Sequence, residues 1–251
     1  MTSPMKTTKR HILLFGMLIT LLLGTTVKAQ LPSPPYPPRL VNDYTGTLTY
    51  DQAETLERML VNYNDTTSTQ ILVLLVDDLQ GYSIDQYATE IGHSWGVGQQ
   101  DKGNGVVIVV KPKTSSEKGQ VSISTGYGME GIIADATAKN IIEREMIPAF
   151  KEEDYYGGIV NAVNVIMDLC SGKFTQDDYN DEGNFWLGIL VIIAIILVIR
   201  WTRGSRSYSG SGMGSGWISS GGGFGGGGGH GGGFSGFGGG GFGGGGASGS
   251  W

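Results

Sequence analysis

The stretch that decides the fold runs from residue 69 to residue 110: TQILVLLVDDLQGYSIDQYATEIGHSWGVG at 69–98, then DKGNGVVIVV at 101–110. It holds two continuously apolar runs, 71–76 and 106–110, on either side of an amphipathic segment. Uninterrupted apolar runs of this length are typical of strands buried on both faces. Because the segment between them repeats its apolar residues at helical spacing, the sequence predicts a βαβ unit with two parallel strands.

A third strand and further helices extend this unit. Residues 121–125, VSIST, alternate apolar and polar side chains, which is typical of a half-covered strand. A short connection links this strand to 106–110, so we expect the two to pair antiparallel. About four amphipathic helices flank the strands, beginning at Thr49, Ser83, Asp135 and Asp154, and the third should end before Pro148. The fold class predicted is α/β, a three-layer sandwich with a small mixed β-sheet.

The N-terminus has the pattern of a signal peptide over residues 1–29. Basic residues precede an apolar run, 12–23, which is short for a membrane span, and Val27-Lys28-Ala29 fits a cleavage site. An uncleaved anchor is the alternative. A proline-rich leader, 30–38, separates this segment from the domain predicted at 39–172.

A second apolar run predicts one transmembrane helix over residues 185–201. Tryptophans lie at both ends of it, as in an aromatic belt, and a buried core helix is the alternative. An acidic linker, 173–184, precedes the run and arginines follow it. Since basic residues stay on the cytoplasmic side, we expect a single-pass protein of the cell membrane with the domain extracytoplasmic and the tail cytoplasmic.

The tail, residues 202–251, is rich in glycine: 26 of the 44 glycines lie after Arg203. Such a composition offers too little apolar surface to offset chain entropy, so it predicts disorder. Five aromatic residues are spaced through it, Phe224, Phe234, Phe237, Phe242 and Trp251. They could act as weak contacts for self-association or for a partner, or the tail could be passive.

Several motifs in register resemble one known family. Beyond the stretch quoted above, these are LVNDYTGTLT at 40–49, STGYGMEGIIAD at 124–135 and PAFKEEDYYGGI at 148–159. In this order they resemble the TPM domain, and the arrangement of signal peptide, domain, apolar helix and glycine-rich tail resembles the bacterial YgcG-like group. The resemblance implies an acidic groove that binds divalent metal and, for a plant member, a proposed acid phosphatase activity.

Composition excludes several chemistries. Residues 39–172 hold 19 acidic and 9 basic side chains, a net charge near −10, which repels nucleic acid and suits a hard cation such as calcium or magnesium. The only histidine there, His93, lies on the polar face of its helix, and the lone Cys170 lies on an apolar face. A zinc site with several His or Cys ligands, a Cys nucleophile and a Ser-His-Asp triad are therefore not expected.

The acidic loops supply the candidate metal ligands. If 106–110 and 121–125 form a hairpin, the loop carrying Asp101 lies beside the loop carrying Glu130, and Asp135 begins the next helix. Asp43 belongs to the N-terminal motif of the resemblance. We predict Asp43, Asp101, Glu130 and Asp135 as metal-site residues. The alternative is structural: a helix cap at Asp135, a turn at Asp101 and backbone amide binding at Asp43.

Two functions fit these features. The first is a divalent-cation-binding interaction or modulator module in the cell envelope, with an envelope or membrane protein as its partner and no nucleic acid. The second is a metal-dependent phosphatase that uses an Asp cluster with Lys102 or Arg144 near the phosphate. The first is favoured because no nucleophile and base can be assigned.

Overall fold

The computed structural model describes residues 31–180 and 234–251. The signal peptide predicted at 1–29 and the transmembrane helix predicted at 185–201 lie outside these residues. Within the two described ranges, no helix is long and apolar enough to cross a membrane.

A five-stranded mixed sheet forms the centre of the domain, in the order β1-β2-β3-β4-β5. Its strands are β1 (Val41–Asp43), β2 (Gln70–Leu75), β3 (Gly105–Lys111), β4 (Gln120–Gly126) and β5 (Phe242–Ser250). The first three strands run parallel, β4 is antiparallel to β3, and β5 is antiparallel to β4. The parallel βαβ unit and the antiparallel hairpin predicted from sequence are both confirmed.

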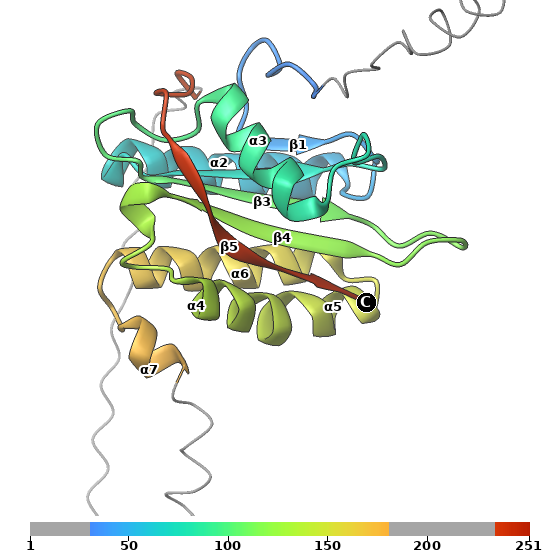
Figure 1. The fold of residues 1–251 in the computed structure, drawn as a ribbon. Helices are drawn as coiled ribbons and strands as arrows, with labels where there is room; N and C mark the ends of the chain where they lie inside the picture. The colour runs from blue at the N-terminus through green and yellow to red at the C-terminus, as the bar shows by residue number, and fades with distance from the viewer. Residues whose placement is uncertain (1–30, 181–233) are drawn as a thin grey trace, which may run out of the picture. The chain divides into compact units, whose positions relative to one another are not determined.

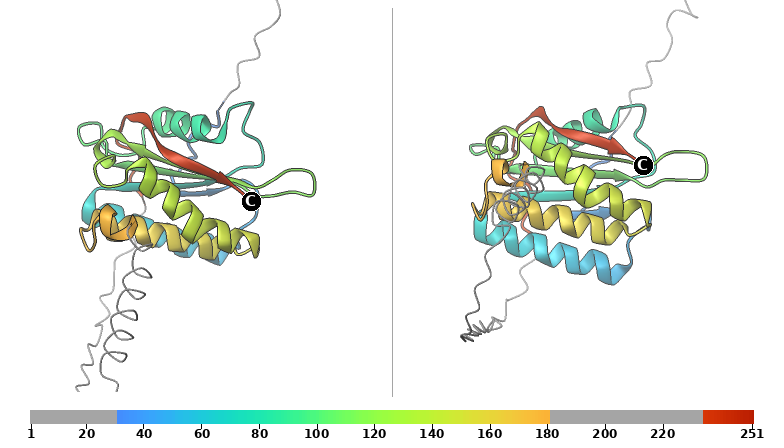
Figure 2. Two further views of the ribbon diagram at one scale, coloured as in Figure 1. Left: turned by 60° about the horizontal axis from the view of Figure 1, so that its bottom comes forward. Right: turned by 90° about the horizontal axis from the view of Figure 1, so that it is seen from below.

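Helices cover both faces of the sheet, which confirms the α/β fold and its three layers (Figures 1 and 2). One face of the sheet forms a common hydrophobic core with α2, α4 and α6, whereas α3 packs on the other face. The helices are α2 (Tyr50–Thr67), α3 (Ile84–Trp95), α4 (Asp135–Ile141), α5 (Ile147–Lys151), α6 (Tyr155–Cys170) and α7 (Gln176–Asn180), with a 3-10 turn, Tyr127–Met129, and a π-helical segment, Ile142–Met146.

Three of the four predicted helix starts are confirmed by their caps. Thr49 and Ser83 each form a capping box, with Gln52 and Gln86 respectively. Asp154 begins α6 by accepting a hydrogen bond from the backbone N–H of Gly157 at 2.8 Å. In each case the side chain satisfies an amide that the first helical turn leaves unpaired.

The third helix does not end before Pro148, as the sequence predicted. It continues from α4 through the π-helical segment into α5, which ends at Lys151. Proline removes one backbone donor and crowds the carbonyl of the preceding turn. The π-helical segment, 142–146, lies immediately before α5 and its Pro148, where the chain widens its hydrogen-bonding pattern instead of ending.

The acidic linker predicted at 173–184 is partly folded. Within it, α7 packs on α4, and Tyr179 is buried in the main core. Thr175 and Asp178 exchange hydrogen bonds at the start of α7, and the Arg144 guanidinium donates to the carbonyl of Tyr179 at 2.8 Å. One aromatic anchor and one cap are enough to attach an otherwise polar segment to the domain.

The prediction of a disordered tail is wrong for the part that the structure describes. Residues 242–250 form β5, which pairs with β4 from Gln120 to Gly126 and lies between α3 and α4 (Figure 1). As a result β4 is buried along its length and not half-covered. Its alternation is real nonetheless, because Ile123 joins the main core while Ser122 and Ser124 face α3.

Candidate functional site

The sheet separates the four predicted metal ligands. Asp43 ends β1 and pairs with Leu75, which in turn pairs with Val110 near the end of β3. Asp101 precedes the beginning of β3 at Gly105. The step from Gly105 to Val110 corresponds to about 17 Å of strand. Asp43 therefore lies at one end of the parallel strands and Asp101 at the other. The four carboxylates do not form one group.

Asp43 is occupied by the backbone that follows it. Its carboxylate accepts hydrogen bonds from the N–H groups of Thr45, Gly46 and Leu48, at 2.9, 3.0 and 2.7 Å, and from the Thr45 hydroxyl at 2.7 Å. This arrangement fixes the turn between β1 and α2. It agrees with the structural alternative considered for this residue.

The expected proximity of the two acidic loops is confirmed. The N–H of Gly128 donates to the carbonyl of Gly103 at 3.1 Å, which brings the loop of Asp101 beside the loop of Glu130. Within residues 31–180 and 234–251, however, no group of three or more His, Cys, Asp or Glu side chains is arranged to hold a metal ion.

Glu130 and Asp135 lie beside β5. The Asp135 carboxylate accepts the N–H of Gly246 at 2.8 Å, and a Cβ added to Gly245 would lie 3.2 Å from Glu130 Oε1. Asp135 is not the cap of α4, because Ala134 takes that position without a side-chain hydrogen bond. The C-terminal strand thus lies against two of the four predicted ligands.

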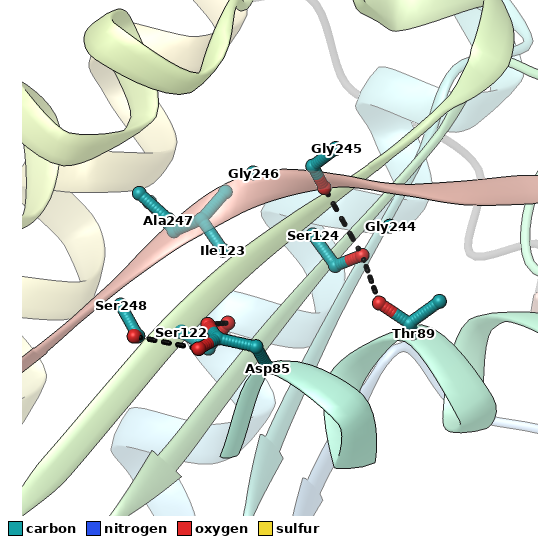
Figure 3. A pocket seen from close by; sticks show the side chains of 10 residues that line it. All are labelled: Asp85, Thr89, Ser122, Ile123, Ser124, Gly244, Gly245, Gly246, Ala247 and Ser248. Atoms are coloured by element: carbon teal, nitrogen blue, oxygen red, sulfur yellow. Dashed lines mark hydrogen bonds between the residues drawn. The ribbon is translucent and has the colours of Figure 1, made fainter. Parts of the chain in front are cut away.

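A polar cavity of about 270 Å³ lies between α3, β4 and β5 (Figure 3). Asp85 of α3 bridges the two strands, because its carboxylate accepts from the hydroxyls of Ser122 at 2.9 Å and Ser248 at 2.8 Å. Ser124 lies 3.1 Å from the Thr89 hydroxyl and donates to the carbonyl of Gly245 at 3.4 Å. The serine hydroxyls of β4 therefore hold β5 in two ways. Ser122 does so through Asp85 of α3, and Ser124 does so directly through its bond to Gly245.

Phe242 anchors the beginning of β5. Its side chain is 2% exposed and lies against Gly92 of α3, where an added Cβ would come within 2.7 Å of the ring. An added Cβ on Gly105 would also approach this ring, to 3.0 Å. A glycine inside a helix costs about 1 kcal/mol relative to alanine, whereas burying a phenylalanine contributes about 1.5–3 kcal/mol. Gly92 and Gly105 therefore form a notch for this ring.

Trp251 anchors the other end. Its indole packs on the rings of Phe150 and Tyr155, with centroid distances of 4.7 and 6.1 Å, and a Cβ added to Gly119 would overlap it. Its backbone N–H donates to the carbonyl of Gly119 at 3.1 Å. The domain thus has a second aromatic notch at the far end of β5.

The chain before β5 is also held by the domain. Phe237 packs against Trp95 of α3 at a centroid distance of 5.8 Å and against Phe234 at 5.0 Å. The Gln70 side chain donates to the carbonyl of Gly236 at 3.1 Å, and the N–H of Gly239 donates to the carbonyl of Gly96 at 2.7 Å. We call residues 234–251 the C-terminal segment and the surface that receives it, along the outer edge of β4, the strand-binding edge.

The remaining reactive side chains take the places expected. Cys170 is half-buried against the core, and burial raises the pKa of its thiol, which disfavours the thiolate. His93 is exposed on α3, with its ring edge-on to Phe242 at 6.0 Å. Neither residue supplies a nucleophile with a partnered base.

Sequence reasoning did not find the strand-binding edge. One signal was present: Phe242 and Trp251 bracket a run whose length is that of a strand, and Ser122 and Ser124 mark a polar face on β4. Glycine, however, has low strand propensity, and alternation cannot show that a partner comes from the far end of the chain.

Together, these features define a three-layer α/β domain with a strand-binding edge that its own C-terminal segment fills. A family model described as TPM phosphatase, TPM domain, matches residues 41–169, and the chain belongs to the TPM domain family.

Two solved structures are similar to this chain. The N-terminal domain of a P. gingivalis protein is 25% identical, with a TM-score of 0.47 over 54% of this chain and 83% of that one. The N-terminal domain of a Corynebacterium glutamicum protein is 17% identical, with a TM-score of 0.42 over 55% of this chain and 84% of that one. The comparison with curated proteins found no match.

The contrast between Asp43 and Asp101 gives a testable prediction. Asp43→Asn should lower the free energy of unfolding by roughly 1–3 kcal/mol, because an amide cannot accept all the hydrogen bonds that the carboxylate accepts. Asp101→Asn, at an exposed position, should change it by no more than about 0.5 kcal/mol. Chemical denaturation without added metal measures both, and equal effects would contradict a structural role for Asp43.

Proposed function

We propose that this chain is an interaction module of the cell envelope that binds extended polypeptide at its strand-binding edge. The observation that carries the proposal is the seating of the C-terminal segment, with Phe242 and Trp251 in two glycine-lined notches. Strand addition gives affinity through backbone hydrogen bonds and specificity through pockets for side chains. The edge of β4 supplies both, along its ladder to β5 and at the two notches.

The chemistry of the edge defines what it can bind. Close approach of Gly246 to the carbonyl of Ile123, and of Gly249 to the side chains of Ile142 and Ile147, leaves no room for a Cβ at either position. The edge therefore suits a glycine-rich strand with an aromatic residue at each end. The carboxylates of Asp85 and Asp135 accept from hydroxyl and N–H groups of the strand, so they disfavour an acidic ligand.

Export and membrane association belong to the same proposal. They rest on the signal peptide pattern at 1–29 and the apolar run at 185–199. A single span at 185–201 would separate the domain from its tail, whereas pairing of β4 with β5 requires both in one compartment. A single crossing at 185–201 and a seated β5 therefore exclude each other within one molecule. We place the C-terminal segment outside with the domain, so that the apolar run associates with the membrane without crossing it once.

Labelling of introduced cysteines tests this location. In a background with Cys170→Ala, we expect Ser235→Cys in the C-terminal segment and Ser116→Cys in the β3–β4 hairpin both to react with a membrane-impermeant maleimide in intact spheroplasts, since both positions are exposed. If Cys at position 116 reacts in intact spheroplasts and Cys at position 235 reacts only after lysis, the tail is cytoplasmic and β5 is not seated in that chain.

Peptide binding tests the strand-binding edge itself. The full chain carrying Phe242→Ser and Trp251→Ser should release its own segment, because both anchors are lost. A labelled synthetic peptide of residues 234–251 should then bind this variant. Its dissociation constant for the variant should be at least tenfold lower than for the unaltered chain, in which the edge is already filled. Fluorescence anisotropy measures both affinities.

A matched peptide provides the control for this experiment. The same peptide with serine in place of Phe242 and Trp251 should lose at least tenfold in affinity. Equal binding of the two peptides would show that the notches do not recognise aromatic anchors, and no binding of either would contradict the proposed function.

Cation binding is a second proposal, supported by the acidic excess of the domain and by the adjacency of the loops of Asp101 and Glu130. Bound calcium or magnesium would relieve repulsion between their carboxylates and stabilise the folded state. Millimolar calcium or magnesium should raise the melting temperature, and Asp101→Asn with Glu130→Gln should remove most of that rise.

The control for the cation experiment removes the same charge elsewhere. Glu90→Gln with Glu152→Gln, both exposed, should keep the metal-dependent rise. A rise that survives the first pair, or no rise at all, contradicts a cation between these loops. Hydrolysis of an aryl phosphate that disappears with the first pair and not with the second would favour the metal-dependent phosphatase instead.

A further inference from the structure

We propose that the strand-binding edge also accepts the C-terminal segment of a second copy of this chain, so that the protein assembles by strand exchange. This inference rests on the proposed function and names the partner. Every contact that seats β5 is non-covalent, and it joins parts of the chain that are far apart in sequence. The same contacts are therefore available to an identical segment from a neighbour.

The composition of β5 favours exchange over permanent closure. Five of its nine residues are glycines, which lose the most conformational freedom when a strand forms. Most of β5 remains exposed or half-buried, and only Phe242 within it is buried. Seating of β5 therefore depends on the aromatic side chains at its two ends, on the hydrogen-bond ladder to β4 and on a few polar contacts, and not on a buried apolar face of the strand.

Covalent reach does not restrict the segment to its own domain. The 53 residues from 181 to 233 join α7 to the C-terminal segment. Even with the short rise of a helix, about 1.5 Å per residue, a chain of that length reaches roughly 80 Å. A domain of about 150 residues has a radius of gyration near 15 Å. The segment can therefore reach the edge of an adjacent copy.

Each copy carries one donor and one acceptor, so two geometries follow. Reciprocal exchange closes a dimer, whereas one-way donation leaves a free edge and a free segment for the next copy. The interface is the one that β5 already makes, including the bridge from Asp85 to Ser248 and the bond from Gly246 to Asp135. Assembly consequently needs no surface beyond the strand-binding edge.

Complementary full-length variants test the inference. The donor-defective chain carries Phe242→Ser and Trp251→Ser and keeps an intact edge. The acceptor-blocked chain carries Gly92→Val and Gly119→Leu, which fill the two notches and leave the segment intact. By size-exclusion chromatography with light scattering, each should be monomeric alone. An equimolar mixture should give a one-to-one complex in which only the acceptor-blocked chain donates its strand.

The outcomes separate this inference from the function on which it rests. If the mixture stays monomeric while the synthetic peptide of residues 234–251 binds the donor-defective chain, exchange between copies is wrong and strand binding stands. If the peptide also fails to bind, both are wrong. Circular dichroism verifies folding of the acceptor-blocked chain. Gly119→Leu alone, outside the helices, replaces the pair if Gly92→Val unfolds α3, and its mixture is judged by the same outcomes.

Discussion

The outer edge of β4 needs hydrogen-bond partners, and much of this structure depends on how it obtains them. Both faces of β4 are covered, one by the core and the other by α3. Its outer N–H and C=O groups would otherwise form an unpaired row, which is costly and invites pairing with other chains. The C-terminal segment supplies the partner, and the positions of Asp85, Asp135 and the two aromatic notches make sense as contacts to it.

Glycine is what allows the partner to fit. A strand with ordinary side chains would meet the Tyr127 ring at position 243 and the carbonyl of Ile123 at position 246. The side-chain contacts that stabilise the bound strand are therefore made mainly at its ends. There Phe242 and Trp251 enter notches that glycines of the domain leave open. The domain and its segment are complementary because each has glycine where the other has bulk.

The sequence predicted the local features well and the distant pairing poorly. Capping boxes at Thr49 and Ser83, the buried strands and the hairpin all follow from neighbouring residues, and all are confirmed. The grouping of Asp43 with Asp101 failed because it depended on the relative direction of β1 and β3: the two strands are parallel, so the end of β1 and the beginning of β3 lie at opposite ends of the sheet. The strand in the tail, β5, was missed because its hydrogen bonds are made to β4, and the composition of the tail does not show that β4 has a free edge.

The pairing of β4 with β5 also sets an order of folding. It closes a loop of more than 100 residues, so its entropic cost exceeds that of the β3–β4 hairpin, and contacts this distant in sequence form late. We therefore expect β1 to β4 to pair before β5 joins them. Ser122 and Ser124 of β4, Asp85 of α3 and Asp135 of α4 all present polar groups to the place that β5 takes. The groups that hold β5 in the folded chain thus also keep an unfilled edge polar, which disfavours pairing with other chains.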